Sequence, residues 1–453
     1  MFCIRVTLFL ILAGIFLSCE DADVPYSTEG VKDLSGLPNV IFILADDVGY
    51  GDLACYGHPY ALTPNLDNLA KQGMLLTNFY VTGSTCVPSR TGFMTGKNPA
   101  AFSLYPREHG FQDRTTITEI LDSIGYATGH VGKWSIGPMP ERGDQTYGIE
   151  DIRIIESNDE AKLGRDEDIF NAAMDFINEK KSQPFYLNIW CRTTHFPVQP
   201  NDSVLALMPE IEVSSDDFGY WFNKEKLDIV IRDSIDADHA MRNYLAEITA
   251  LDKNIGRIID TLKQLGIFDK SIIAFSSDQG PAPIQSPKDL STEKERLKMN
   301  MLGYAGGLRG GKHDFYEGGV RVPFIISWPE SIPAGNIDST SVVSGLDWLP
   351  TLCDITGVKL NKQIFHGQSV LGVLKGRPQK DFLPLFWQKH GQKEVTTRWK
   401  DWKYHEKQEG SDQLFSMSED PLEKQNVIED HPEVQLKIRE AIDNFKRQMK
   451  TER

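Results

Sequence analysis

The stretch Asn39–Asp47, which reads NVIFILADD, points to the fold of this 453-residue chain. Its apolar residues run without a break and end at two aspartates. Alternating apolar and polar residues mark a strand with one face in water, whereas an unbroken apolar run is typical of a strand covered on both faces. Strands of that kind lie in parallel sheets between layers of helices. The stretch therefore predicts an α/β fold with a buried, largely parallel sheet.

The rest of the chain supports this architecture, because strand-like apolar runs alternate with amphipathic helical segments. The expected strands lie at 126–131, 184–190, 271–277 and 322–329, and the expected helices at 65–74, 116–125, 168–180 and 246–266. After residue 360 the pattern changes to short strand candidates at 386–388, 395–399 and 402–406 and a helix at 432–449. We predict a large mixed, mostly parallel sheet sandwiched by helices over 38–360, and a smaller C-terminal α+β domain over 361–453.

The N-terminal segment is typical of an exported protein. Arg5 precedes an apolar run of 12 residues, Val6–Leu17, which is too short to span a bilayer and fits a signal peptide. The run ends in FLSC, which resembles a lipoprotein lipobox, although Phe16 departs from the usual leucine. We expect a signal peptide over 1–18, a lipid anchor at Cys19 as the only membrane attachment, and a tether over 19–37. The expected location is the outer membrane or periplasm of a Gram-negative bacterium; the alternative is an ordinary secreted protein cut nearby.

Charge and cysteine content narrow the function further. The chain has 48 Lys and Arg residues against 64 Asp and Glu, a formal net charge of −16. We therefore predict no nucleic-acid partner, because phosphate binding needs a basic surface, whereas a local cluster of cations can still bind an anionic substrate. Too few cysteines for a disulfide scaffold lie beyond the N-terminal segment, and a single bridge stays open. They are Cys55, Cys86, Cys191 and Cys353.

Polar residues follow the predicted strands at their carboxyl ends, where open α/β sheets bind ligands. In chain order they are Asp46 and Asp47, Lys133, His195, Asp278 and Gln279, and Lys312 in a glycine-rich loop. Carboxylate and amide oxygens are hard ligands that suit Ca²⁺ or Mg²⁺, and lysines suit a tetrahedral oxyanion. Each residue alone is more often a helix cap, a packing residue or a solvated charge. Their occurrence together predicts a metal-assisted site for an anionic group.

The stretch Ser84–Gly96, which reads STCVPSRTGFMTG, adds a cysteine to this set. Pro88 suits the first turn of a helix, so Cys86 is expected just before a helix N-terminus. Such an end favours negative charge, and Arg90 would share the site one turn further on. A lone cysteine is more often a small buried apolar residue. The position at a helix end favours a functional role.

These residues and their neighbours resemble the motifs of a known family. CVPSRTGFMTG resembles the C-x-P-S-R-x(4)-T-G signature of type I, formylglycine-dependent sulfatases of the alkaline-phosphatase-like superfamily. Other segments agree in order from about Asn39 to Asn426, among them GHVGKWS, TTHFP, SSDQG and LRGGKHDFYEGG. The chain is similar in particular to Bacteroidetes carbohydrate sulfatases. The resemblance implies hydrolysis of sulfate esters, most often on a sulfated glycan or oligosaccharide.

The resemblance also implies roles for the residues of the site. A formylglycine-generating or sulfatase-maturating enzyme converts Cys86 to formylglycine (3-oxoalanine), whose hydrated form is the nucleophile. The implied calcium ligands are Asp46, Asp47, Asp278, Gln279 and the modified residue 86. Arg90 steadies residue 86, while Lys133, Lys312 and His195 bind the sulfate. His195 is the implied donor of a proton to the leaving alcohol.

Two positions depart from the family pattern. The usual GKWH reads GKWS here, so Ser135 stands where a histidine normally assists residue 86. His313, beside Lys312, is the preferred substitute and is expected to contact the substrate; His130 is the other candidate, although packing is its commoner role. Gln279 replaces the more usual asparagine, and its carbonyl still suits calcium.

Two other functions stay open. One is hydrolysis of phosphate or phosphonate esters on the same fold. The other is binding of sulfated glycans by a catalytically impaired protein in which Cys86 is unmodified. Specificity is expected from loops 136–165 and 198–240 and from the C-terminal domain. That domain carries Trp387, Trp399, Trp402 and His405. These rings suit stacking on sugars, although core packing explains such residues more often.

Overall fold

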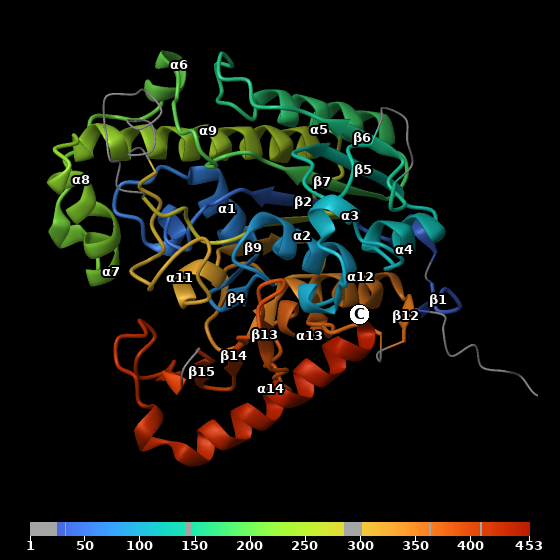
Figure 1. Cartoon of the computed structure of the whole chain (residues 1–453). Coiled ribbons are helices and arrows are strands. Elements are labelled where there is room, and N and C mark those ends of the chain that lie inside the picture. Colours follow the sequence, from blue (N-terminus) through green and yellow to red (C-terminus); the bar gives the residue numbers. More distant parts are fainter. Residues whose placement is uncertain (1–24, 32, 141–145, 285–300, 362–363, 408–409) are drawn as a thin grey trace, which may run out of the picture.

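The computed structural model describes residues 25–31, 33–140, 146–284, 301–361, 364–407 and 410–453 (Figure 1). The predicted signal peptide, the expected lipid-bearing Cys19 and the first part of the predicted tether lie outside the described residues. Within the rest of that tether, β1 (Tyr26–Ser27) pairs antiparallel with β12 (Lys359–Leu360). Among the described residues, no helix has both the length and the apolar character needed to cross a membrane.

The large domain is built on one eight-stranded sheet in the order β10-β3-β9-β8-β2-β7-β5-β6. Its strands are β2 (Asn39–Ala45), β3 (Met74–Leu76), β5 (Ala127–Gly132), β6 (Asp151–Ile154), β7 (Phe185–Trp190), β8 (Ser271–Ser277), β9 (Phe324–Ser327) and β10 (Asn336–Asp338). Only β9 runs antiparallel to its neighbours, β8 and β3. The prediction of a mixed, mostly parallel sheet is confirmed. The expected strands all occur, whereas the short strands β3, β6 and β10 were not predicted.

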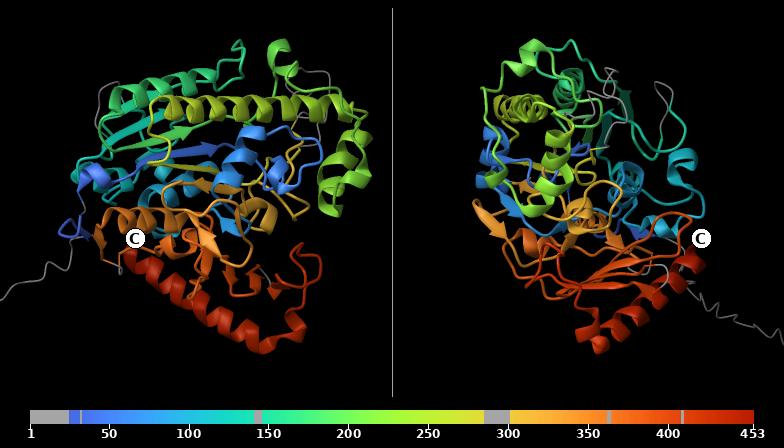
Figure 2. Two further views of the ribbon diagram at one scale, coloured as in Figure 1. Left: turned by 180° about the vertical axis from the view of Figure 1, so that it is seen from behind. Right: turned by 60° about the vertical axis from the view of Figure 1, so that its left-hand side comes forward.

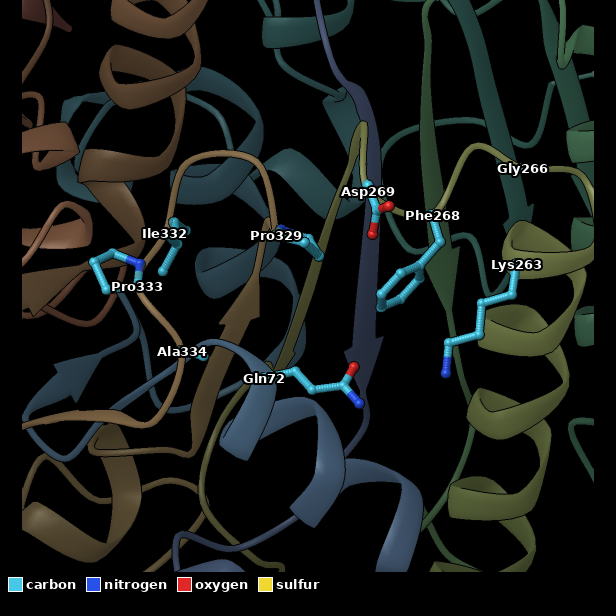
Figure 3. Close-up of a pocket in the computed structure, with 9 residues that line it drawn as sticks. All are labelled: Gln72, Lys263, Gly266, Phe268, Asp269, Pro329, Ile332, Pro333 and Ala334. Atoms are coloured by element: carbon cyan, nitrogen blue, oxygen red, sulfur yellow. The ribbon is translucent and has the colours of Figure 1, made fainter.

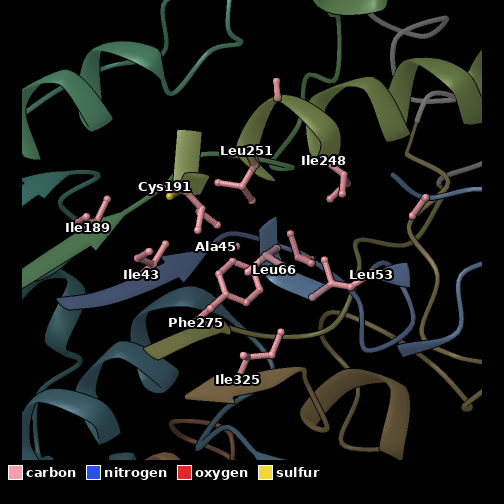
Figure 4. Packing of buried hydrophobic residues seen from close by; sticks show 14 of the residues in the cluster. Ile43, Ala45, Leu53, Leu66, Ile189, Cys191, Ile248, Leu251, Phe275 and Ile325 are labelled. Atoms are coloured by element: carbon pink, nitrogen blue, oxygen red, sulfur yellow. The ribbon is translucent and has the colours of Figure 1, made fainter. Parts of the chain in front are cut away.

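Strand β2 lies near the middle of the sheet and is buried at every position. Its side chains alternate between two hydrophobic layers, as the pleat of a strand requires. Ile41 and Ile43 join the layer under one set of helices, while Phe42 and Leu44 join the opposite layer. Figure 4 shows the first layer, where β2 and β8 pack against the helix that carries Leu251. An unbroken apolar run is thus what a strand between two cores needs.

Helices cover both faces of the sheet (Figures 1 and 2). One layer contains α1 (Pro64–Gln72), α5 (Glu167–Lys180) and α9 (Ala237–Gln264). The other contains α2 (Cys86–Thr95), α4 (Ile117–Ser123) and α12 (Trp348–Thr356). Other short helices and strands are β4 (Phe79–Tyr80), β11 (Val343–Ser344), α3 (Pro106–His109), α6 (Asp202–Leu205), α7 (Tyr220–Phe222), α8 (Asp228–Arg232), α11 (Glu317–Val320) and α13 (Leu371–Leu374).

The C-terminal part forms a second, smaller unit. Its antiparallel sheet has the order β13 (Leu385–Trp387), β14 (Thr396–Trp399), β15 (Trp402–His405) and β16 (Gln413–Ser416). Helix α14 (Pro432–Glu452) lies along its outer side (Figure 2) and packs Ile438 and Ile442 with Tyr404 of β15. The predicted α+β character is confirmed, and β16 is a strand that was not predicted. The limits 38–360 and 361–453 stay predictions.

Candidate active site

The predicted polar residues meet at one edge of the large sheet because their strands are neighbours. Asp46 follows β2, Asp278 follows β8 and Lys133 follows β5, and these strands run parallel. Backbone hydrogen bonds continue past the strand ends. The Asp46 N–H donates to the Thr193 carbonyl at 2.9 Å, and the Asp278 N–H donates to the Ala45 carbonyl at 3.1 Å. The sheet itself therefore places these side chains side by side.

Three buried aspartates and one cysteine form the centre of this site. One ligand atom from each of Asp46, Asp47, Asp278 and Cys86 lies within 4.8 Å of the others. Asp47 adopts a left-handed backbone conformation, with φ +67°. Its N–H donates to Asp278 Oδ1 at 3.3 Å. Carboxylates packed this closely repel one another unless cations balance them.

Three cationic side chains surround the carboxylates. Arg90 Nη2 lies 2.7 Å from Asp278 Oδ2, and Lys312 Nζ lies 2.7 Å from Asp47 Oδ1. Lys133 forms an ion pair with Asp46. Burial alone raises the pKa of Asp46, but the charges of Lys133 and Arg90 outweigh it and hold that pKa below its ordinary value. Burial and the charge of Asp46 raise the pKa of Asp278 to about 6.

Gln279 has a buried carbonyl oxygen without a hydrogen-bond partner among the described residues. Its Nε2 donates to Asp47 and lies 3.5 Å from Asp46 Oδ1. A half turn of the amide exchanges the two atoms and turns the carbonyl towards the carboxylates. The site then offers oxygen ligands from four side chains, the donor set that suits Ca²⁺. The residues present fit a hard divalent cation.

Cys86 is the first residue of α2, directly beside the carboxylates. Its Sγ lies 3.4 Å from Asp46 Oδ1 and 3.5 Å from Lys133 Nζ. Burial and the charges of Asp278 and Asp46 raise the pKa of the thiol well above its ordinary value. Since the thiolate is the reactive form of cysteine, an unmodified Cys86 is a poor nucleophile at neutral pH. The position suits a residue that reacts through oxygen.

His195 lies in the loop after β7 and is held firmly. Its Nδ1 lies 2.9 Å from the Phe196 carbonyl, which can only accept a hydrogen bond, so Nδ1 carries the proton. Arg165 donates to the His195 carbonyl at 2.7 Å. The imidazole is near enough to lower the pKa of Asp46 when charged. Nε2 is thus the atom available to a substrate.

The two histidines considered as replacements for a partner at Ser135 lie in different surroundings. His130 is fully buried, its Nε2 is 3.1 Å from the Lys133 carbonyl, and its ring meets the ring of Trp190 edge-on. Burial lowers its pKa to about 3, as expected of a packing residue. His313 is exposed, and its backbone N–H donates to the Ser84 carbonyl at 2.8 Å, two residues from Cys86. Ser135 is partly buried just beyond β5.

Some residues of the site were missed in the sequence. Trp190 ends β7, and the guanidinium of Arg90 lies 4.7 Å from the centre of its ring. Arg165 holds the His195 loop from a distant segment. Trp190 could have been found as the aromatic last residue of a strand that points at the site. Arg165 has no signal in the sequence, because its role depends on the tertiary fold.

A separate cavity of about 660 Å³ lies at the opposite edge of the sheet (Figure 3). It is lined near the start of β8 by Lys263, Phe268 and Asp269. Parallel strands present their amino ends there, and none of the residues predicted for the site lines it. The chemistry therefore gathers at the carboxyl ends of the strands.

The C-terminal aromatic residues mostly pack inside. Trp387 is buried and donates to the Val81 carbonyl at 2.7 Å, and His405 is buried beside Glu423 at 3.0 Å. Trp399 and Trp402 are partly buried against the core of the small domain. For Trp387 and His405, core packing is thus the role the structure supports.

Comparisons with known proteins agree with this geometry. A family model described as Sulfatase matches residues 38–358, and one described as N-sulphoglucosamine sulphohydrolase, C-terminal, matches 311–450. Human arylsulfatase A is 28% identical over 401 residues, 77% of this chain and 70% of that protein. The N-acetylgalactosamine-6-O-sulfatase of Bacteroides thetaiotaomicron is 27% identical over 486 residues, 90% of this chain and 93% of that protein.

The fold is shared with solved structures. The crystal structure of Ps i-CgsB in complex with k-i-k-neocarrahexaose superposes with a TM-score of 0.74 at 23% identity and covers 90% of this chain and 92% of its own. This likeness confirms the predicted alkaline-phosphatase-like α/β fold. The matched sulfatase region also contains the whole cluster of carboxylates, cations and Cys86. The chain therefore belongs to the sulfatase family of sulfuric ester hydrolases.

Proposed function

We propose that this enzyme hydrolyses sulfate esters of carbohydrates, with residue 86 as formylglycine and calcium bound by Asp46, Asp47, Asp278 and Gln279. The observation that carries the proposal is the position of Cys86 at the start of α2, within the aspartate cluster. A thiol there has a strongly raised pKa, which disfavours direct attack by sulfur. Conversion of Cys86 requires a formylglycine-generating or sulfatase-maturating enzyme as a partner.

The charge of the site supports an anionic substrate. Three carboxylates and three cationic side chains cancel one another in the cluster. A bound divalent cation then leaves a net charge of about +2, which attracts a sulfate ester. Lys133 and Lys312 reach the same space from β5 and from the glycine-rich loop, and point charges of this kind suit a tetrahedral anion.

Formylglycine at position 86 would supply the nucleophilic oxygen, and a bound calcium ion would polarise the sulfur. The chain's own residues do the rest. Arg90 forms ion pairs with Asp278 and Asp46, and so fixes the positions of these two carboxylates relative to each other. Lys133 and Lys312 orient the sulfate. His195, with its Nδ1 proton engaged by Phe196, presents Nε2 to the leaving oxygen and delivers a proton from that atom when it is charged.

The carbohydrate substrate is supported by the relatives, one of which is an N-acetylgalactosamine-6-O-sulfatase. The test is a screen of sulfated mono- and oligosaccharides, with protein whose residue 86 has been examined by mass spectrometry. We expect sulfate release from at least one sugar, and none from the Cys86→Ala variant. Absence of release by fully modified protein would contradict the proposal. Release of phosphate or phosphonate at higher kcat/KM would favour the phosphorus-ester alternative.

Export and lipid anchoring remain separate proposals that rest on the N-terminal sequence. We infer cleavage before Cys19 and a lipid anchor that holds the mature chain in the outer membrane or periplasm of a Gram-negative bacterium. The test is fractionation of cells that express the full chain. The Cys19→Ala variant is expected to leave the membrane fraction, and its retention there would contradict the anchor.

A further inference from the structure

A trough leads from the start of α2 to the C-terminal domain. A cavity of about 430 Å³ is lined on one side by Ser84, Thr85 and Pro88, and on the other by Lys389 and His390 of the turn between β13 and β14. A second cavity, of about 970 Å³, continues along the same turn. The two share His313, Phe315, Lys389 and Gln392. The trough therefore joins the two domains beside the residue that reacts.

Tyr105 links the near end of the trough to the reacting residue. Its hydroxyl interacts with the side chain of Thr85, the residue before Cys86, and burial raises its pKa. The ring of Tyr105 lies 5.5 Å, centre to centre, from the ring of His390. His313 lines both cavities and follows Lys312 directly. A sugar whose sulfate reaches Lys312 thus has its ring, and any sugar linked to it, directed into the trough.

The far side of the trough carries lysines that lie over aromatic rings: Lys389 Nζ is 5.8 Å from the ring centre of Phe315, and Lys407 Nζ is 5.1 Å from that of Tyr316. Lys389, Lys393 and Lys407 line it, and none of them forms an ion pair with a described residue. Lys446 differs, because it pairs with Glu406 at 2.7 Å. Asp314 and Glu394 also line the trough. Unpaired lysines beside aromatic rings, on a chain of net charge −16, suit a ligand that carries several anionic groups.

We propose that this trough binds the rest of a sulfated oligosaccharide, and that Lys389 and His390 bind a second anionic group on the sugar next to the one that loses its sulfate. The proposal rests on the sulfatase function above and names its substrate more closely: a polyanionic chain and not a singly sulfated sugar. The second group is a sulfate or a carboxylate, which offer the same acceptor oxygens. Lys389 would bind this second anionic group from an exposed turn, so replacement of Lys389 should not disturb the fold.

The test measures binding apart from turnover. The Cys86→Ala protein, which cannot react, is titrated by calorimetry with tetrasaccharides of chondroitin 6-sulfate, heparan sulfate and carrageenan, and with the corresponding sulfated monosaccharides. We expect at least one tetrasaccharide to bind about tenfold or more tightly than its monosaccharide, with strong dependence on salt. A panel in which no tetrasaccharide gains affinity would overturn the proposal.

Variants then locate the second group. Lys389→Ala and His390→Ala, in the Cys86→Ala background, are expected to remove most of the tetrasaccharide's advantage and to weaken its salt dependence. Lys375→Ala, an exposed lysine outside the trough, is the matched control and should bind like the parent. Equal affinity of the Lys389→Ala and Lys375→Ala proteins would refute the assignment. A chondroitin tetrasaccharide with reduced carboxyl groups distinguishes the two kinds of second group. Weaker binding after reduction identifies a carboxylate, and unchanged binding identifies a sulfate.

The result is separable from the test of sulfatase activity. If active protein releases sulfate but Lys389→Ala changes no binding, the trough assignment fails and the sulfatase function stands. If no sugar loses sulfate but Lys389→Ala still weakens binding, the proposed reaction fails and the subsite stands.

Discussion

The guanidinium of Arg90 grips the carboxylate of Asp278 with both side chains fully buried. Arg90 Nε and Nη2 lie 3.0 and 2.7 Å from the same oxygen, Asp278 Oδ2. The face of the guanidinium rests on Trp190, and Nη2 also reaches Asp46 Oδ2 at 3.4 Å. One side chain therefore holds aspartates from two neighbouring strands. It leaves Nη1 without a partner among the described residues.

Replacement of Arg90 by lysine is expected to lower kcat/KM at least a hundredfold although charge is conserved. Lysine has neither the planar face that stacks on Trp190 nor the fork that reaches two carboxylates. Arg90→Ala should also lower the free energy of unfolding by about 3–5 kcal/mol, because it leaves buried charges unpaired. Steady-state kinetics and denaturant unfolding measure the two effects. The exposed Arg377→Lys is the control, and wild-type kinetics for Arg90→Lys would refute the role.

Calcium should stabilise the folded protein through the aspartate cluster. A ligand that binds only the folded state, at a hundred times its Kd, contributes about 2.7 kcal/mol. We expect a chelator to lower the Tm of the wild-type protein, and calcium to restore it more effectively than magnesium. Asp47→Asn should remove this response, whereas the exposed Asp260→Asn should retain it. Calorimetric titration with calcium gives a readout that does not depend on activity. A Tm that responds to calcium equally in both variants would contradict the site.

Much of this site was predictable because strand direction carries the information. Asp46, Lys133 and Asp278 each follow an apolar run, and parallel pairing of those runs brings their ends together. The same logic found His195. It could not find Arg165, which reaches the His195 loop from another segment, since no local pattern records such a contact.

The surroundings of the two candidate histidines, His130 and His313, could not be predicted from the sequence either. In the sequence, His313 adjoins Lys312 and His130 stands three residues before Lys133, so both were candidates. The structure separates them, because His130 faces the core between Trp134 and Trp190 whereas His313 faces a cavity. Strands β13, β14 and β15 were predicted, but β16 was not, and neither was the position of the turn after β13 beside the start of α2, because long-range packing between domains leaves no periodic signal.

His313 is expected to act as the base that Ser135 cannot be. Partial desolvation and the charge of Lys312 lower the pKa of His313, so the imidazole is neutral at pH 7 and able to accept a proton. His313→Ala should reduce kcat by about 10²–10⁴-fold. If His313 acts in the expulsion of sulfate, the His313→Ala protein should, on rapid mixing with substrate, release a burst of alcohol before sulfate appears. The exposed His109→Ala is the control. Unchanged turnover in His313→Ala would exclude this role.

A histidine at position 135 should compensate for the loss of His313. Ser135 lies in the segment that follows β5, two residues beyond Lys133, a residue of the site. We therefore expect Ser135→His to raise kcat of the His313→Ala protein at least tenfold. Ser135→Ala serves as the control for altered size and should give no gain. Equal rates for the two double variants would contradict a shared role.

Glu423 is expected to make the stability of the folded enzyme depend on pH. It is fully buried in the C-terminal domain, accepts from the Glu317 N–H at 2.6 Å and lies 3.0 Å from His405 Nε2. Burial, with the charge of Glu317, raises its pKa from an ordinary 4.5 to about 8. Burial lowers the pKa of His405, so a protonated Glu423 donates to a neutral imidazole at pH 7.

The folded state therefore keeps a proton on Glu423 that the unfolded chain releases above pH 4.5, so stability should fall as pH rises from about 4.5 to 8 and level off above. Glu423→Gln keeps a donor and an acceptor but cannot ionise. Between pH 5 and pH 9, we expect the free energy of unfolding of the Glu423→Gln protein to fall by about 1–3 kcal/mol less than that of the wild-type protein. Denaturant unfolding at pH 5, 7 and 9 measures this difference. The control Glu440→Gln, at an exposed position, should show the same change of unfolding free energy with pH as the wild-type protein. The same pH dependence in Glu423→Gln would show that Glu423 does not cause it.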